Sequence, residues 1–190
     1  MTGQIPDSFL YKDEVYSLSG ISKGDLFSPT DYGFSPRIAS TACWRGYVLY
    51  FTIRNESLIL VDMAINASEE LEINGVKPEK KNNTFKLHYH DLNFKIDFTG
   101  TLIIAKDFID TMYVHMGFQR LIAYETVLEL NFDHGKLISE RDLSHQIKKQ
   151  RDKNPLDKST PKSMKDKDIR EWIERSFSLE YNPDEDEEEE

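Results

Sequence analysis

Apolar residues alternate with polar ones in several short runs between residues 47 and 137. The run YVLYFTIR, residues 47–54, is followed after Asn55-Glu56 by SLILVDMAI, residues 57–65. Both runs are rich in β-branched and aromatic residues, and a two-residue link that contains Asn favours a hairpin because Asn tolerates a positive φ. Both faces of the first run are apolar, so we predict a central strand that is covered on both sides.

The segment TFKLHYHDLNFKIDF, residues 84–98, changes parity in its middle. Its early apolar residues and its late ones fall on opposite faces of a continuous strand. Side chains alternate with period two, so a strand without a break would flip its core face here. We therefore predict a turn or a bulge near His90-Asp91.

The remaining apolar runs complete a strand-rich pattern. They are GTLIIA, TMYVHMGF, the long RLIAYETVLELNF and, after the tight turn Asp133-His134-Gly135, KLIS. About eight short strands at near-regular spacing, without alternating helices, indicate an all-β domain. We predict a mainly β fold, an antiparallel meander that forms a barrel or a sandwich, with one or two C-terminal helices.

The composition changes after residue 140, which defines the predicted organisation. A late apolar stripe has helical spacing, and the final residues DEDEEEE carry only acids. The stripe is expected to dock on the sheet or on a partner. The predicted parts are a β-rich domain (1–140), a basic polar helix or linker (141–166), a short amphipathic helix (167–182) and a disordered acidic tail (183–190).

Charge and composition narrow the class of protein. The 190 residues have a formal net charge of -10 and a single cysteine. One cysteine gives no sign of an oxidising compartment, and the N-terminus has no signal-peptide pattern. No apolar run approaches the length of a membrane helix, so we expect a cytoplasmic protein with no membrane contact. The stretch 141–167 is basic, but the overall charge and the acidic tail disfavour nucleic acid as a partner.

The densest group of chemically active residue types is ACWRGY, residues 42–47. Cys43 lies in no recognisable signature with a histidine, so we interpret it as a small buried filler at the start of a strand. Arg45 is expected to form an internal ion pair with one of the acids, and Asp62 and Asp97 are candidates inside strand-like runs. The chain contains no phosphate-binding loop, nucleophile elbow or zinc-protease motif.

Six residues are candidates for a binding site, because Trp, Arg and Tyr dominate binding hot spots. They come from three parts of the sequence, and His115 accompanies them in an apolar context: Trp44, Arg45, Tyr47, Tyr113, His115 and Trp172.

A metal site has only weak support. His88 and His90 are two residues apart and would point the same way from a strand, as zinc or copper ligands can. Both fall on the polar face of their run, so solvated histidines are the preferred interpretation. No metal or other cofactor is predicted.

The chain resembles a family of small uncharacterised bacterial proteins. The resemblance rests on a Thr-x-x-Trp-Arg-Gly-Tyr opening in STACWRGYVLYFTIRNESLILVDM and on a late Tyr-x-His-Met-Gly segment before YETVLELNFDHGKLI. It covers residues 9–143. It implies no established activity and no catalytic residue, and proteins of this appearance resemble immunity and adaptor proteins.

Two functions are open from the sequence. The first is a non-enzymatic protein that binds another protein, a basic one included, through an acidic surface. The alternative is a small-ligand-binding or enzymatic β-barrel. That alternative requires Trp44, Arg45, Tyr113 and His115 to converge on one cavity. The pattern leaves the oligomeric state open.

Overall fold

The computed structural model describes residues 2–153, 161 and 163–181 of the chain. Within these residues the protein is mainly β, with ten strands in one sheet and two α-helices after it. The elements are β1 (Ser8–Tyr11), β2 (Glu14–Ile21), η1 (Pro29–Tyr32), β3 (Tyr47–Arg54), β4 (Ser57–Ile65), β5 (Glu79–Lys80), β6 (Leu87–Tyr89), β7 (Phe94–Lys95), β8 (Gly100–Phe108), η2 (Asp110–Met112), η3 (Leu121–Ala123), β9 (Tyr124–Asp133), β10 (Lys136–Asp142), α1 (Ser144–Lys153) and α2 (Asp166–Ser176).

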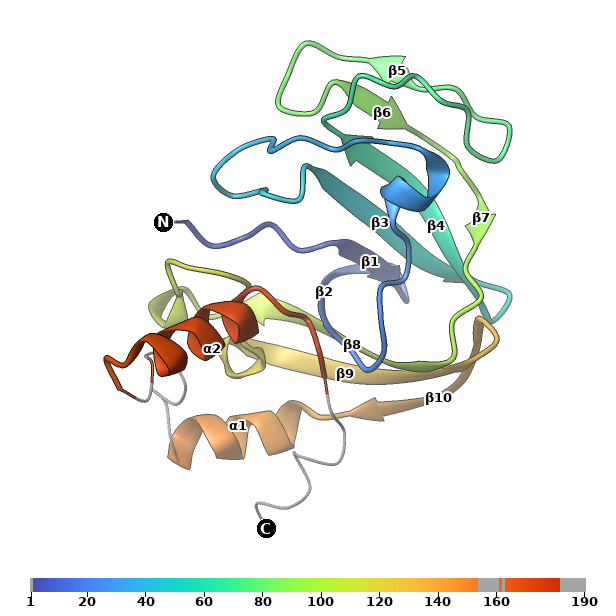
Figure 1. The fold of residues 1–190 in the computed structure, drawn as a ribbon. Coiled ribbons are helices and arrows are strands. Elements are labelled where there is room, and N and C mark those ends of the chain that lie inside the picture. Colours follow the sequence, from blue (N-terminus) through green and yellow to red (C-terminus); the bar gives the residue numbers. More distant parts are fainter. Residues whose placement is uncertain (1, 154–160, 162, 182–190) are drawn as a thin grey trace.

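The sheet curls into a ring-like shape (Figure 1). Its strand order is β10-β9-β8-β2-β1-β3-β4-β6-β5, and β7 also pairs with β4. A single bridge from Lys136 of β10 to Ser57 of β4 joins the two halves, which does not make a barrel. The predicted mainly β class with C-terminal helices is confirmed. The sheet is mixed rather than wholly antiparallel, because β1 runs parallel to β3.

The β3–β4 hairpin confirms the strongest local prediction. Asn55 and Glu56 adopt φ values of 50° and 64°, the left-handed pair that a tight hairpin requires. One part of the prediction was wrong. Tyr50 is 41% exposed, so the outer face of β3 is only partly covered. Val48 and Thr52, on the same face of β3, are buried.

The parity break was also predicted correctly. Asp91 has a φ of 52°, and the chain leaves β6 there before β7 starts. Both short strands pair with β4, at opposite ends of it. The break therefore lets one segment follow β4 while Tyr89 and Leu92 both reach the core.

An N-terminal hairpin forms the centre of the sheet. Lys12 and Asp13 have φ values of 50° and 63° and link β1 to β2. β1 pairs with β3 and β2 pairs with β8, so this hairpin joins the early and late halves of the sheet. We had predicted no individual strands for this part of the chain.

Two hydrophobic clusters lie on opposite sides of β8 and β9. Leu102 and Ile104 point into the main cluster inside the ring, whereas Ile103 points into a second cluster outside it. This alternation follows from the period of two along a strand. The helix α1 covers the second cluster with Leu143 and Ile147, which lie next to its first turn and one turn further on.

The C-terminal segment returns to the body of the protein. Helix α2 carries the predicted apolar stripe, and the chain after it reaches the end of β2. The Ile21 amide donates to the Leu179 carbonyl at 2.7 Å, and the Tyr181 amide donates to the Ile21 carbonyl at 2.9 Å. The predicted acidic tail, 183–190, lies outside the described residues. No helix in the described part of the chain has the length and apolarity needed to span a membrane.

Candidate functional site

A buried ion pair holds the loop that enters β3. The Arg45 guanidinium donates from Nη1 to Asp7 Oδ2 at 2.8 Å and from Nη2 to Asp7 Oδ1 at 2.5 Å. The Leu49 amide also donates to Asp7 Oδ1, at 2.6 Å, and Arg45 Nε donates to the Tyr47 carbonyl at 2.9 Å. The predicted internal ion pair of Arg45 is therefore confirmed.

The acid of this pair differs from the candidates chosen by sequence. Asp62 accepts a hydrogen bond from the Asp91 amide, and Asp97 lies 3.1 Å from His134. Both candidates belong to the β4–β7 side of the sheet, while the loop before β3 lies against the start of β1. Asp7 precedes β1 directly, which places its carboxylate beside Arg45.

Burial affects the two partners differently. It raises the pKa of Asp7, against the lowering effect of the Arg45 charge and of the Leu49 amide. For Arg45, burial lowers the pKa, but the Asp7 carboxylate more than compensates and the net shift is upward. The difference follows from depth, since the Asp7 side chain is 6% exposed and that of Arg45 is 24% exposed.

A glycine makes this arrangement possible. Gly46 has a φ of 81°, and a Cβ there would lie 2.1 Å from the Arg37 carbonyl oxygen. Only glycine fits this approach without displacing the backbone. The guanidinium of Arg45 then lies over the ring of Tyr47, 4.9 Å from its centroid.

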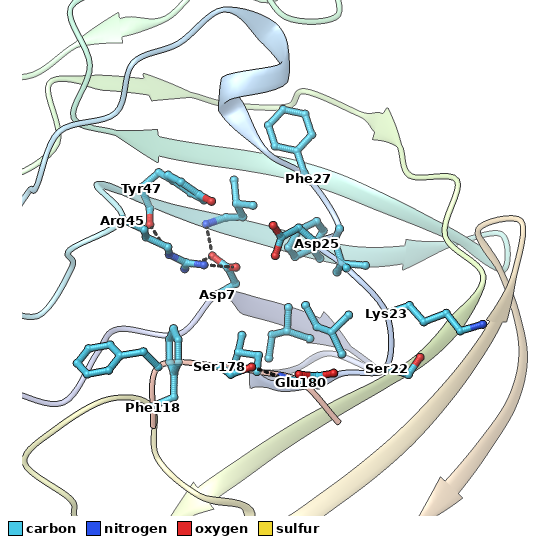
Figure 2. A pocket seen from close by; sticks show the side chains of 18 of the residues that line it. Asp7, Ser22, Lys23, Asp25, Phe27, Arg45, Tyr47, Phe118, Ser178 and Glu180 are labelled. Atoms are coloured by element: carbon cyan, nitrogen blue, oxygen red, sulfur yellow. Dashed lines mark hydrogen bonds and ion pairs between the residues drawn. The ribbon is translucent and has the colours of Figure 1, made fainter. Parts of the chain in front are cut away.

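A cavity of about 570 Å³ opens next to this ion pair (Figure 2). Its walls come from the N-terminal hairpin, the loop after β2, the first half of β3 and the segment after α2. The lining residues are Asp7, Leu18, Ile21, Ser22, Lys23, Gly24, Asp25, Leu26, Phe27, Arg45, Tyr47, Leu49, Phe51, Phe118, Glu174, Phe177, Ser178, Leu179 and Glu180.

Cys43 is a buried residue in the loop that enters β3. Its thiol lies 3.4 Å from the Tyr47 carbonyl oxygen, and burial raises its pKa. A raised pKa keeps the thiol protonated and therefore weakly nucleophilic. The interpretation of Cys43 as a structural filler is confirmed by its burial.

Trp44 lies on the outside of the same loop. Its ring stacks on Phe177, with the ring centroids 5.0 Å apart, and its amide donates to Gln4 Oε1 at 3.1 Å. Trp44 remains 46% exposed in spite of these contacts. The indole is therefore both fixed in place and accessible to a partner.

Tyr113 and His115 lie on the other side of the N-terminal segment. The Gly3 amide donates to the Tyr113 hydroxyl at 3.0 Å, and the rings of Tyr113 and His115 meet edge to face. The N-terminal segment forms hydrogen bonds both with the segment of Tyr113 and with the loop of Trp44, so it connects the two. Four exposed apolar side chains lie on the segments that these contacts connect, and we call them the aromatic surface: Ile5, Trp44, Tyr113 and, on α2 about one turn before Phe177, Ile173.

The six candidate binding residues thus separate into different places. Arg45 and Tyr47 line the cavity, whereas Trp44, Tyr113 and His115 do not belong to its lining. Trp172 is half-buried on α2, where its carbonyl accepts a hydrogen bond from the Ser176 hydroxyl. The four residues that the barrel alternative required do not converge on this cavity.

The histidine pair is similarly explained by local contacts. His88 Nε2 lies 3.0 Å from the Phe85 carbonyl oxygen, and burial lowers the pKa of His88. His90 lies 3.6 Å from Asp62 and 3.7 Å from Glu79. Among the described residues, no group of three or more His, Cys, Asp or Glu side chains could hold a metal ion.

Sequence reasoning missed Asp7 and Asp25 as residues of the site. Asp7 follows a proline directly before an alternating run, SFLYKDEVYSLSGI, in which Lys12-Asp13 separates two strand-like halves. This pattern was a usable signal for the N-terminal hairpin. The loop that contains Asp25 carries no such signal.

Comparison with known proteins adds no assignment. No family model matches the chain, and no curated protein and no solved structure is significantly similar to it.

Proposed function

We propose that this chain is a non-enzymatic binding protein that recognises another protein through the aromatic surface. The observation that carries the proposal is the state of Trp44, which is held by stacking and a hydrogen bond and yet is 46% exposed. Rigid, accessible Trp and Tyr side chains are the commonest hot spots of protein interfaces.

The neighbouring side chains support the same function. Ile5, Tyr113 and Ile173 are between 39% and 41% exposed and adjoin Trp44 through the N-terminal segment and α2. Grouped apolar side chains on a surface are typical of interaction sites. The formal net charge of -10 favours a basic partner, because it speeds the encounter with positive surfaces.

The catalytic alternative has less support. Of its four proposed residues only Arg45 lines the cavity, and the thiol of Cys43 is buried with a raised pKa. An immunity- or adaptor-like role in the cytoplasm fits a binding function and remains part of this proposal. The one cysteine, which is buried and free, supports a reducing compartment.

Affinity capture from the source cell tests the proposal with matched variants. The full-length protein, Trp44→Ala and Ile173→Ser would be compared with Val15→Ser, which removes an apolar side chain that is 67% exposed on β2, away from the aromatic surface. A hot-spot residue contributes at least about 2 kcal/mol, or roughly 30-fold in Kd. We expect both aromatic-surface variants to lose the partner and Val15→Ser to retain it.

Two controls make the result interpretable. Trp44→Ala also removes the stack on Phe177, so Ile173→Ser, whose side chain makes no hydrogen bond, tests the surface without that effect. Equal thermal unfolding of Ile173→Ser and the wild type would show that its fold is intact. Equal capture by all variants would reject the aromatic surface, and turnover of an ester, phosphate or glycoside substrate would reject the non-enzymatic function.

A further inference from the structure

The cavity beside Arg45 has the size of a ligand site and no role in the contact proposed above. Its volume of about 570 Å³ falls within the range of small-molecule pockets, which is roughly 300–1,000 Å³. Figure 2 shows it between the Asp7–Arg45 pair on one side and the segment of Ser178 and Glu180 on the other.

The lining of the cavity combines polar groups with apolar and aromatic side chains. Six of its lining residues are buried aliphatic or aromatic residues of the core, which form a floor for a hydrocarbon chain. They are Leu18, Ile21, Leu26, Phe27, Leu49 and Phe51. Phe118 and Phe177, which are half-buried, supply further ring surface. Aromatic rings attract cations through their negative faces.

The charged residues of the lining are unbalanced. Asp7 and Arg45 neutralise each other through their bidentate contact. The charges that remain are the carboxylates of Asp25, Glu174 and Glu180 and a single ammonium group, that of Lys23. Figure 2 shows the Lys23 side chain pointing away from Asp25. The cavity therefore carries excess negative charge, which attracts a cation and repels an anion.

Asp25 is the acid best placed to receive that cation. Its carboxylate forms no hydrogen bond or ion pair with any other residue in the described part of the chain, and Figure 2 shows it turned toward Tyr47 and Asp7. Its charge contributes to the raised pKa values of both residues, although burial is the larger cause in each case. A cation at this point would therefore relieve repulsion as well as pair with Asp25.

We propose that the cavity binds an alkylammonium or alkylguanidinium group, with the cationic head at Asp25 and the hydrocarbon chain on the apolar floor. This chemistry belongs both to lysine and arginine side chains of a polypeptide and to free amines. The proposed ligand would bind apart from Trp44, Tyr113 and Ile173, which are not part of the cavity lining, although Phe177, on which Trp44 stacks, belongs to it.

Small probes of equal length test the charge preference directly. Full-length, ¹⁵N-labelled protein would be titrated with butylamine, butylguanidine, butanol and butyrate, and the amide shifts of Asp25, Ser178 and Glu180 would be followed by NMR. We expect both cationic probes to shift these amides and to bind at least tenfold more tightly than butanol, with no binding of butyrate. Equal binding of butylamine and butanol, or no shift with either cation, would overturn the proposal.

A matched pair of variants tests the role of Asp25. Asp25→Asn and Glu72→Gln each remove one negative charge from an exposed side chain, but only Asp25 lines the cavity. We expect Asp25→Asn to weaken butylguanidine binding at least fivefold and Glu72→Gln to leave it unchanged. Equal affinities of the two variants would reject Asp25 as the receiving group, and unfolding curves would verify that both variants are folded.

A peptide probe distinguishes the two sources of the cation. Acetyl-Ala-Arg-Ala-amide would be compared with butylguanidine on the same protein. Tighter binding of the peptide would assign the site to a polypeptide side chain, and tighter binding of butylguanidine would assign it to a free amine. Because no partner protein is present in these titrations, their result does not depend on whether the aromatic surface binds one.

Discussion

Replacing Arg45 by methionine would leave the buried carboxylate of Asp7 without its cation. Methionine retains most of the length of the side chain, so the change removes the charge and its hydrogen bonds with little loss of packing. Asp7 would keep one donor, the Leu49 amide at 2.6 Å. The variant therefore measures how strongly the ion pair stabilises the loop that enters β3.

The expected loss of stability follows from the depth of the pair. Removing one partner of a buried ion pair costs about 3–5 kcal/mol, because the other charge remains buried and unpaired. The retained Leu49 hydrogen bond favours the lower end, about 3 kcal/mol. For a protein of this size such a loss lowers Tm by roughly 6–12 °C.

The loss should also depend on pH. Without Arg45, the desolvation that already raises the pKa of Asp7 is opposed only by the Leu49 amide, so this pKa rises further above its unfolded value. A carboxyl group whose folded pKa is raised stabilises the fold below its unfolded pKa, and this contribution is lost as pH rises through the folded pKa. The difference between wild type and variant should thus shrink as pH falls from 7 toward 4.

Urea unfolding at pH 7 and at pH 4 measures the free energy of unfolding of Arg45→Met, and Arg54→Met is the control. Arg54 is an exposed arginine at the end of β3 whose guanidinium contacts the exposed Asn93 side chain. Its replacement should change the free energy of unfolding by no more than about 0.5 kcal/mol. If Arg45→Met were as stable as Arg54→Met at pH 7, the Asp7–Arg45 pair would not be a stabilising anchor.

Three further predictions concern other parts of the fold. Gly117→Ala places a Cβ 1.9 Å from the Ser176 carbonyl oxygen, so we expect the segment after α2 to detach, with faster hydrogen exchange there and unchanged exchange in β3. Leu60→Ala, at a fully buried position, should cost about 2–5 kcal/mol in urea unfolding, and a loss below 1 kcal/mol would contradict the assigned core. Burial raises the pKa of Tyr89 to about 12. The contribution of this phenol to the free energy of unfolding should therefore be fully present below pH 10 and be lost as pH rises toward 12. In absorbance at 295 nm, Tyr89→Phe should remove the phenol that titrates near pH 12.

The features that could be predicted from the sequence are local. The Asn55-Glu56 turn and the break at Asp91 require a positive φ. Asn and Asp tolerate a positive φ, so these positions can be recognised in the sequence. The turn at His134-Gly135 follows the same rule. In each case the determining contacts lie within a few residues, so a short window contains the information.

The features that were missed depend on distant parts of the chain. Asp7 and Arg45 are 38 positions apart, and their pairing requires that β1 lie beside β3. No pattern within either segment specifies this neighbour, because many acids in the chain could satisfy one arginine. Only Arg45 and Tyr47 of the six candidate binding residues line the cavity, and this too depends on contacts between distant segments.

The return of the C-terminal segment to the end of β2 affects the order in which the protein can mature. One wall of the cavity consists of Glu174, Phe177, Leu179 and their neighbours, and it adjoins Ile21 at the end of β2. During synthesis the sheet can assemble as its strands emerge, but this wall is absent until Glu174 to Glu180, which follow all ten strands in the sequence, have left the ribosome. A chain that stops early would present an unfinished cavity with an open apolar floor. The completed cavity is consequently a sign that translation has reached the end of the described chain.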